Sequence, residues 1–394
     1  MIKFTPILSA AFASLFYFGL VDNARGPTYP DFLNSFGISS AAGSLIYALS
    51  SFAGLLVIMT TKYWLPYIHL RKSFVISSLL LSSSSFMLYF AHMIDNFMLA
   101  LISSIVLGIG VGFCSVSMNL AVDSQAPVPL RRQTFAALHT TYGISSLLSP
   151  LLYSFLISIG LKVWSHYYLV LGILALFIFF LPGKGDNVFI KTHQETDKDK
   201  EKEGVDEPRI PFGLLLVISL CVGTYVASEI AVSSRLVYFL EEVHQFDKIM
   251  ANNALSLFFF FLTAGRLSLA IYSWKISSQT LMLGSLIFTI ILSFLGLYNF
   301  PYAFSFTGLT MSIFFPSIMD WLGQVFPKDF TKVTSFALTG ISAHLVLMHL
   351  GFGKLVTELG LEKAMFLTIG LSIISLVMLL ILIIWSQFRS KEVL

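Results

Sequence analysis

The sequence predicts an all-α polytopic membrane protein with twelve transmembrane helices arranged as two six-helix bundles. Three observations support this prediction. Of the 394 residues, 56% are apolar and only 11% are charged, with a mean hydropathy of +0.83. Soluble domains carry about 25% charged residues, so the composition excludes that class. Apolar stretches of about 20 residues, long enough to cross a bilayer as a helix, recur along the chain. One strongly charged segment separates them near the middle.

The expected spans are helices because lipid offers no hydrogen-bond partner to the backbone, so each segment has to satisfy its own peptide groups. The short alternating segments of a membrane barrel are not found in the sequence. The spans are expected at residues 5–33, 41–61, 73–92, 97–122, 133–159, 165–182, 211–240, 252–272, 279–298, 300–323, 331–356 and 363–386.

The charged segment divides the spans into two equal groups. Residues 183–210 contain fourteen charged residues, of which eight are acidic and six are basic. Such a segment cannot bury an apolar core, so we expect a solvated linker. The sequence thus predicts an N-terminal bundle at residues 1–182 and a C-terminal bundle at residues 211–394.

Basic residues in the loops predict the orientation. With the N-terminus inside, the cytoplasmic segments hold eleven Lys and Arg residues and the outer loops hold four. Because basic residues are retained on the cytoplasmic side, both termini and the linker are expected in the cytoplasm. The expected location is the plasma membrane, which is the inner membrane if the source is a bacterium.

The stretch DNARGPTYP, residues 22–30, raises the main functional question. It follows an apolar run, so it either begins an outer loop or continues the first helix. Glu229 lies inside a long apolar segment, and a Phe-Leu pair follows both Asp22 and Glu229 after ten residues, as expected of a repeat. The match favours a helix that continues to about Leu33, kinked or unwound at Gly26 and Pro27.

Carboxylates within a membrane span indicate function. One at mid-helix costs about 2.5–3.5 kcal/mol, so Asp22 and Glu229 should face a cavity or a partner. Arg25 lies three residues from Asp22 on the same helix face and is a candidate ion partner, and Asn23 lies between them. Removal from water disfavours the charged form of a carboxylate, which makes both residues candidates for proton coupling. Sodium coupling through the same residues stays open.

Other polar residues in the spans are less decisive. Asn119 either lines the cavity or bonds a neighbouring helix, and His139 and Tyr142 share one helix face, where a packed histidine is the alternative. Four charged residues are candidates for gating or ion pairing. Asp123 could cap its helix or pair with a nearby arginine, and Asp320 could pair at an inner gate or contact ligand. Arg266 could anchor its span at the inner face, and Arg235 could extend to the outer surface.

Several classes of function are not supported. Cys114 and Cys221 both lie in apolar segments, so neither a disulfide framework nor a metal site is expected. The chain has no basic cluster with interleaved aromatic residues, so no nucleic-acid partner is expected. Because no catalytic motif is found, we expect neither an enzyme nor a cofactor.

Twelve expected spans, a charged central linker and a 6+6 repeat resemble the major facilitator superfamily. Residues 225–240, YVASEIAVSSRLVYFL, resemble the Tyr-Val-Gly-x-Glu pattern of its fucose permease-like group of sugar:proton symporters, with Ala227 where glycine is usual. Residues 137–152, ALHTTYGISSLLSPLL, resemble its Leu-His, Gly and Pro-Leu-Leu stretch, and residues 314–320, FFPSIMD, its Phe-Phe-Pro segment. Asn119 stands where the group commonly has asparagine. The resemblance implies the major facilitator fold, places Asp22 as the coupling aspartate, and adds Tyr225 to the site.

The sequence also departs from the pattern. Residues 60–72, TTKYWLPYIHLRK, lack the glycines and the aspartate that the superfamily usually has between spans 2 and 3. No residue clearly corresponds to the span 4 glutamate of the fucose permease.

The expected function is secondary transport of a small polar solute, a sugar, with protons. The expected partners are this solute, the proton and the lipid bilayer, and the expected oligomeric state is a monomer. A drug or metabolite exporter that exchanges protons is the alternative, although its usual span 5 motif Gly-x-x-x-Gly-Pro-x-x-Gly-Gly is not matched after Gly143. A membrane sensor would normally bring a signalling domain, and the linker and tail are short.

Overall fold

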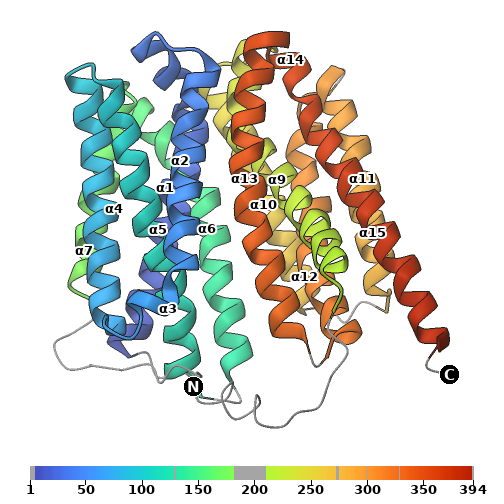
Figure 1. Cartoon of the computed structure of the whole chain (residues 1–394). Coiled ribbons are helices and arrows are strands. Elements are labelled where there is room, and N and C mark those ends of the chain that lie inside the picture. The colour runs from blue at the N-terminus through green and yellow to red at the C-terminus, as the bar shows by residue number, and fades with distance from the viewer. Residues whose placement is uncertain are drawn as a thin grey trace.

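The computed structural model describes residues 5–127, 130–181, 210–271, 275–298, 300–327 and 329–392. Within these ranges all regular secondary structure is helical (Figure 1). Ten of the described helices are long and apolar enough to cross a membrane. The predicted all-α membrane fold is confirmed.

The helices follow the expected spans closely. The first group comprises α1 (Pro6–Phe36), α2 (Ser40–Met59), α3 (Thr61–Trp64), α4 (Leu70–Met93), α5 (Phe97–Gln125), α6 (Arg131–Ser158) and α7 (Ser165–Phe179). The second comprises α9 (Phe212–Glu242), α10 (Lys248–Ile271), α11 (Ser278–Tyr298), α12 (Ala303–Val325), α13 (Phe330–Leu359), α14 (Leu361–Ala364) and α15 (Phe366–Glu392). Each expected span coincides with one helix. Helix α7 is shorter than the ten helices that are long and apolar enough to cross a membrane, and α12 is not one of those ten. The count of twelve spans therefore stays a prediction.

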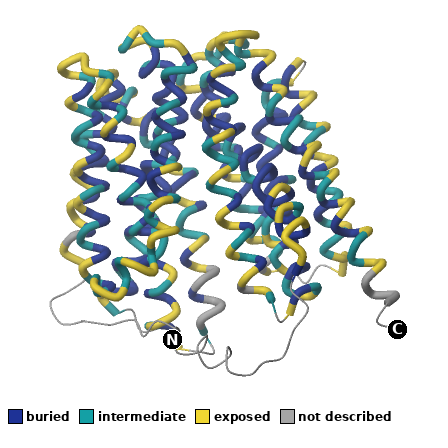
Figure 2. The backbone as a smooth tube through the Cα atoms, in the orientation of Figure 1, coloured by how far each residue is buried: buried dark blue, intermediate teal, exposed yellow. Residues whose placement is uncertain are grey.

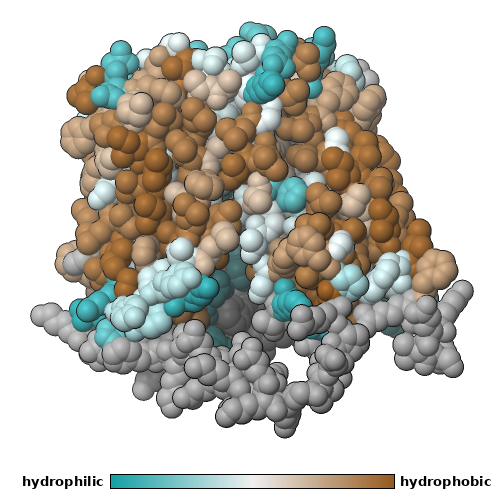
Figure 3. Space-filling view, in the orientation of Figure 1, coloured by the Kyte–Doolittle hydropathy of each residue, from teal (hydrophilic) through white to brown (hydrophobic). Residues whose placement is uncertain are grey.

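The outer surface of the helices is apolar. Figure 3 shows a broad hydrophobic belt with hydrophilic residues concentrated at the two ends, and Figure 2 shows the most buried backbone toward the centre. Large apolar side chains such as Phe90, Phe155 and Phe177 are exposed in this belt. Exposed apolar area on this scale requires a lipid environment, so the protein is a multi-pass membrane protein.

Helix α1 passes through the stretch DNARGPTYP without a break. The Thr5 hydroxyl caps its start by accepting a hydrogen bond from the Leu8 backbone N–H (3.2 Å), and Gly37, with φ of 60°, ends it. The outer-loop interpretation is therefore wrong. Of the two alternatives at Gly26 and Pro27, unwinding is also wrong, since Pro27 and Pro30 both lie within the helix, whereas a kink stays a prediction.

Two prolines lie inside α1, where each lacks the N–H that would bond a carbonyl one turn earlier. Pro27 and Pro30 therefore leave the Asn23 and Gly26 carbonyls without their usual partner. In membrane helices, adjacent helices help to accommodate such losses. Helix α9 packs closely on α1 at this level, since a Cβ atom on Gly26 would lie 3.0 Å from the Ser233 carbonyl oxygen.

The helices form two groups that lie side by side, with α1 and α9 facing each other between them (Figure 1). Helix α1 packs on α5 and α6, and α9 packs on α13 and α15. Both α1 and α9 contain 31 residues, and Asp22 and Glu229 each lie just past the middle of their helix. This correspondence agrees with the repeat suggested by the sequence. The exact bundle boundaries at 1–182 and 211–394 stay a prediction, since residues 182–209 lie outside the described ranges.

The two groups contact each other mainly through α2 with α13, α6 with α10, and α1 with α9. We call the end of the molecule where α1 begins and α15 ends the terminal end, and the opposite end the far end. Asp31 forms an ion pair with Lys248, and the Asn252 amide donates to the Ser154 hydroxyl (3.2 Å). All four residues lie near the far ends of their helices. At the terminal end, Figure 3 shows a recess between the two groups.

Candidate functional site

A polar cluster in the first group of helices is built around Asp22 of α1. Arg25, one turn further along, forms an ion pair with Asp22 through its Nη2 and the carboxylate Oδ1. The Tyr142 hydroxyl of α6 donates to the other carboxylate oxygen, Oδ2 (2.9 Å). Both oxygens therefore have a donor, which offsets the cost of placing a carboxylate at mid-membrane.

Asn23 and Gly19 fix the position of α1 against α6. The Asn23 amide donates to the Ser146 hydroxyl (2.9 Å) and contacts the Tyr142 hydroxyl (3.4 Å). A Cβ atom on Gly19 would lie 1.9 Å from the Ser145 hydroxyl oxygen, so the two helices approach too closely for a larger residue. Small residues allow such close packing of membrane helices. The approach is what brings Tyr142 within reach of Asp22.

The second group of helices contains a corresponding cluster around Glu229 of α9. Arg266 of α10 donates to the carboxylate Oε1 (3.1 Å), and the Tyr225 hydroxyl donates to Oε2 (2.8 Å). The Tyr225 hydroxyl also contacts the Met311 carbonyl, and its ring stacks on Phe314 at 4.1 Å between centroids. Arg266, a candidate for gating or ion pairing, is here the ion partner of Glu229, and its role as an anchor at the inner face stays a prediction.

Each group of helices thus carries a carboxylate, an arginine and a tyrosine. The two triads are Asp22, Arg25 and Tyr142 in the first group, and Glu229, Arg266 and Tyr225 in the second. They meet where α6 crosses α10, since a Cβ atom on Gly143 would lie 2.7 Å from the Thr263 hydroxyl oxygen. Tyr142 is near enough to Glu229, and His139 to Arg266, for electrostatic interaction. The triads therefore border one shared region between the groups.

Arg235 of α9 does not reach the outer surface, which overturns the predicted surface position. Its exposed fraction is 0%, and its guanidinium lies over the rings of Tyr29 (4.2 Å) and Tyr47 (4.3 Å). Its Nη2 donates to the Ser44 hydroxyl (3.0 Å). The reason is the closed far end, where α1 and α2 cover the path to water. A desolvated cation–π contact contributes about 2 kcal/mol, while burying an ion costs several kcal/mol.

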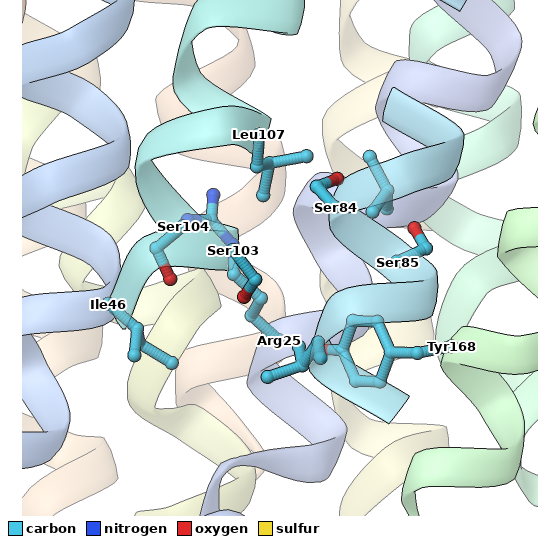
Figure 4. Close-up of a pocket in the computed structure, with 10 residues that line it drawn as sticks. Arg25, Ile46, Ser84, Ser85, Ser103, Ser104, Leu107 and Tyr168 are labelled. Atoms are coloured by element: carbon cyan, nitrogen blue, oxygen red, sulfur yellow. The ribbon is translucent and has the colours of Figure 1, made fainter. Parts of the chain in front are cut away.

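A small cavity lies beside Arg25 within the first group of helices. Figure 4 shows the Arg25 side chain extending toward Ser103 and Ser104 of α5, with Tyr168 nearby. The cavity volume is about 20 Å³, which is room for one water molecule. Such a water could accept from the buried Arg25 Nη1, which has no partner among the described residues.

The other predicted residues make no hydrogen bond to the triads in the described part of the chain. Asn119 is exposed and its amide donates to the Ser115 carbonyl of its own helix (2.8 Å). Asp320 is exposed near the terminal end and accepts hydrogen bonds from Ser278 (2.7 Å) and Gln324 (2.8 Å), which does not support ligand contact. Asp123 is exposed in the last turn of α5, and the side chains of the arginines proposed to pair with it, 131 and 132, lie outside the described set. His139 is exposed on α6, one turn from Tyr142.

Sequence reasoning missed several residues at the interface between the groups. Tyr47 stacks on the buried His349 of α13, with ring centroids 4.8 Å apart, and it gave no signal because a tyrosine is ordinary in an apolar helix. Asp31 gave a signal that was overlooked, since it is a second carboxylate within the expected first span. The part of the chain that the structure describes contains no group of three or more His, Cys, Asp or Glu placed to hold a metal ion.

Solved transporter structures share this architecture. A D-xylose-proton symporter matches with a TM-score of 0.76 and 13% identity, over 95% of this chain and 96% of that chain. The inward open xylose transporter XylE from E. coli matches with a TM-score of 0.72 and 13% identity, over 95% and 94%. FucP in the outward conformation matches with a TM-score of 0.63 and 14% identity, over 94% and 97%. Identities this low show the fold alone.

Sequence comparison gives the family. No curated protein matches the chain in a direct search. The sequence model of the Major Facilitator Superfamily matches residues 11–228, which is more than half of the chain. The resemblance to that superfamily, and in fold to its sugar:proton symporters, is confirmed. The protein is accordingly a transporter rather than an enzyme, and it belongs to the major facilitator superfamily.

Proposed function

We propose that the protein is a secondary active transporter that moves a small polar solute, a sugar, across the plasma membrane by alternating access coupled to protons. The observation that carries this proposal is the pair of triads at the border of the two groups of helices. Carboxylates in a membrane interior are costly and mark solute or proton pathways. In transporters built from repeats, the solute site lies between the repeats near the membrane midplane.

Asp22 and Glu229 are proposed to exchange the proton. In this state each carboxylate accepts hydrogen bonds from an arginine and a tyrosine. Protonation would remove the charge that holds Arg25 or Arg266 in place and would release these donors to the solute. A carrier whose carboxylates are neutral or paired can reorient without moving an uncompensated charge through the low-dielectric interior. Sodium is the alternative ion for the same residues.

The state of the transporter follows from where the two groups touch. The hydrogen bonds and the ion pair identified between them lie toward the far end, as in Asp31 with Lys248 and Ser154 with Asn252. We propose that the terminal end is cytoplasmic, because the loops there hold the excess of Lys and Arg. The described conformation would then be closed to the outside and open toward the cytoplasm. The transporter is proposed to act as a monomer.

A sugar is favoured by the chemistry of the site and by the fold. Sugar sites combine groups that bond hydroxyls with aromatic faces, and the triads supply carboxylates, guanidinium groups, tyrosine hydroxyls and the Tyr142 ring. One of the solved structures with the same fold is a D-xylose-proton symporter. The exporter alternative is not favoured, because α6, the helix of span 5, does not carry the exporter motif after Gly143.

Uptake into proteoliposomes tests the proposal. Labelled fucose, galactose, glucose and xylose are offered with a pH gradient that is acid outside. One sugar should accumulate against its gradient, and Asp22→Asn or Glu229→Gln should reduce accumulation to simple equilibration. Asp320→Asn is the matched control, because this carboxylate is exposed and bonds only to Ser278 and Gln324 among the partners identified. Failure of every sugar to enter, or wild-type accumulation in both variants, would contradict the proposal.

A further inference from the structure

Three side chains at the interface between the groups of helices form a buried unit, which we call the Tyr47 cluster. It consists of Tyr47 of α2, Arg235 of α9 and His349 of α13. The Arg235 guanidinium lies 4.3 Å from the centre of the Tyr47 ring, and the His349 ring stacks on Tyr47 at 4.8 Å. All three residues are at least nine-tenths buried. One comes from the first group of helices and two come from the second.

The Tyr47 cluster has a concentration of unmet hydrogen-bonding capacity. Arg235 Nε and Nη1, the Tyr47 hydroxyl and His349 Nδ1 have no hydrogen-bond partner in the described part of the chain. Buried polar atoms are nearly always hydrogen bonded, so four such atoms in three touching residues need an explanation. The two arginine atoms can only donate, and the hydroxyl can donate as well. At Arg235 the cluster therefore lacks acceptors, because its Nε and Nη1 have no oxygen or nitrogen to donate to among the described residues.

The cluster also carries an uncompensated positive charge. Over the described ranges, no carboxylate lies within ion-pair distance of Arg235, whereas Asp22 pairs with Arg25, Asp31 with Lys248 and Glu229 with Arg266. The aromatic faces of Tyr29, Tyr47 and Phe352 around Arg235 offset part of this charge. They provide no oxygen to accept from Nε and Nη1. Arg25 also lies over the Tyr47 ring, at 4.8 Å, but its charge is paired with Asp22.

We propose that the Tyr47 cluster binds an anionic group of the transported solute, a carboxylate, so that the solute is an acidic sugar rather than a neutral one. This inference rests on the proposed transport function and names its substrate class. A carboxylate has two oxygens, and each of them can accept a hydrogen bond from a guanidinium N–H group. It would supply the missing acceptors and the missing negative charge together, whereas a neutral hydroxyl would supply only an acceptor.

The location of the cluster suits a solute site that opens and closes. Tyr47 and Ser44 belong to α2, and Arg235 and His349 belong to α9 and α13 across the interface. Separation of the groups at the far end would expose the guanidinium to an incoming solute. Closure would then bury the bound carboxylate with Arg235, one or two helical turns from Asp22 and Glu229.

Thermal unfolding of the purified full chain in detergent, with matched acidic and neutral sugars, tests the inference. The probes are D-glucuronate against D-glucose and D-galacturonate against D-galactose, with L-lactate as a carboxylate that is not a sugar and sodium chloride as an inorganic anion. A uronate should raise the Tm by a few degrees, since a ligand that binds the folded state stabilises it. Binding of the acidic sugar should be about tenfold or more tighter than that of its neutral partner, as expected for hydrogen bonds to charged groups.

Substitutions separate a ligand-binding arginine from a structural one. Arg235→Met should abolish the uronate shift while keeping or raising the ligand-free Tm, because it removes a buried unpaired charge. Arg235→Lys should weaken the shift, since an ammonium lacks the planar set of N–H groups of a guanidinium. Lys248→Met is the matched contrast. It should lower the ligand-free Tm, because it leaves Asp31 without its partner.

Each other outcome has a definite meaning. A shift with glucose or galactose and none with the uronates would overturn the inference and leave neutral-sugar transport intact. A shift with lactate but with no sugar would uphold the anion site and contradict the sugar part of the proposed function. Three further results would overturn the inference. They are a Tm shift with chloride alone, the absence of a Tm shift with every probe, and a uronate shift that survives in Arg235→Met.

Discussion

The ion pair between Asp31 of α1 and Lys248 of α10 is predicted to hold the far end closed. The two side chains are 26% and 28% exposed, and the Tyr153 hydroxyl also donates to Asp31 (2.7 Å). Replacing Lys248 by alanine removes the only contact of this kind found between the groups in the described ranges. It should therefore shift the population toward the state that is open at the far end.

The magnitude follows from the partial burial of the pair. Exposed ion pairs contribute about 0.2–1 kcal/mol, and loss of one partner from a buried pair costs about 3–5 kcal/mol. For a pair that is about a quarter exposed we take about 1–2 kcal/mol, which is a factor of about 5–30 in the population ratio.

Cysteine labelling measures this shift. Ser40 lies at the start of α2 and is 6% exposed in the closed far end, so Ser40→Cys should react with a membrane-impermeant maleimide mainly when the far end opens. The native Cys114 and Cys221 are buried and give little background. In the Lys248→Ala background the labelling rate of Ser40→Cys should rise about 5- to 30-fold, if opening is fast relative to labelling.

A matched lysine provides the control. Lys354 pairs with Glu358 on its own helix at 3.7 Å, and both side chains are largely exposed, at 74% and 56%. Lys354→Ala should therefore leave the labelling rate of Ser40→Cys unchanged. Equal labelling rates in Lys248→Ala and Lys354→Ala would refute the assignment of Lys248 to closure of the far end.

Two further predictions concern the contact between α6 and α10 and the Glu229 triad. Gly143→Ala should slow uptake, because its Cβ atom would lie 2.7 Å from the Thr263 hydroxyl oxygen. Adding Thr263→Ala should restore uptake, and slow uptake in the double variant would contradict this steric explanation. Arg266→Met should lower thermal stability by about 1–3 kcal/mol, less than for a fully buried pair because Arg266 is 36% exposed. Adding Glu229→Gln should recover part of that loss in the same unfolding assay, and additive losses would show that the two residues are not coupled.

Local spacing along the sequence determined much of the fold. Apolar runs of sufficient length placed every observed long helix, since hydropathy measures the preference of a segment for lipid. The match between Asp22 and Glu229 correctly placed DNARGPTYP inside a helix. The three-residue spacing of Asp22 and Arg25 put them on one face, because helix periodicity alone sets that contact.

The expectation of an unwound segment at Pro27 was wrong for a physical reason. Propensity describes the isolated backbone, whereas in a membrane the helix satisfies the remaining backbone groups, and α1 is also packed against α6 and α9. The sequence shows the prolines, but it does not show which neighbours surround them.

Only the tertiary structure decided which side chains on different helices bond to each other. Arg266 is 37 residues from Glu229, Tyr142 is 120 residues from Asp22, and Arg235 is 191 residues from Ser44. Hydropathy reports the depth of a residue in the membrane, but not its direction around the helix axis. That direction depends on close packing at positions such as Gly19 and Gly143. Arg235 is the clearest case: its depth alone suggested a surface position, and closure of α1 and α2 over α9 buried it instead.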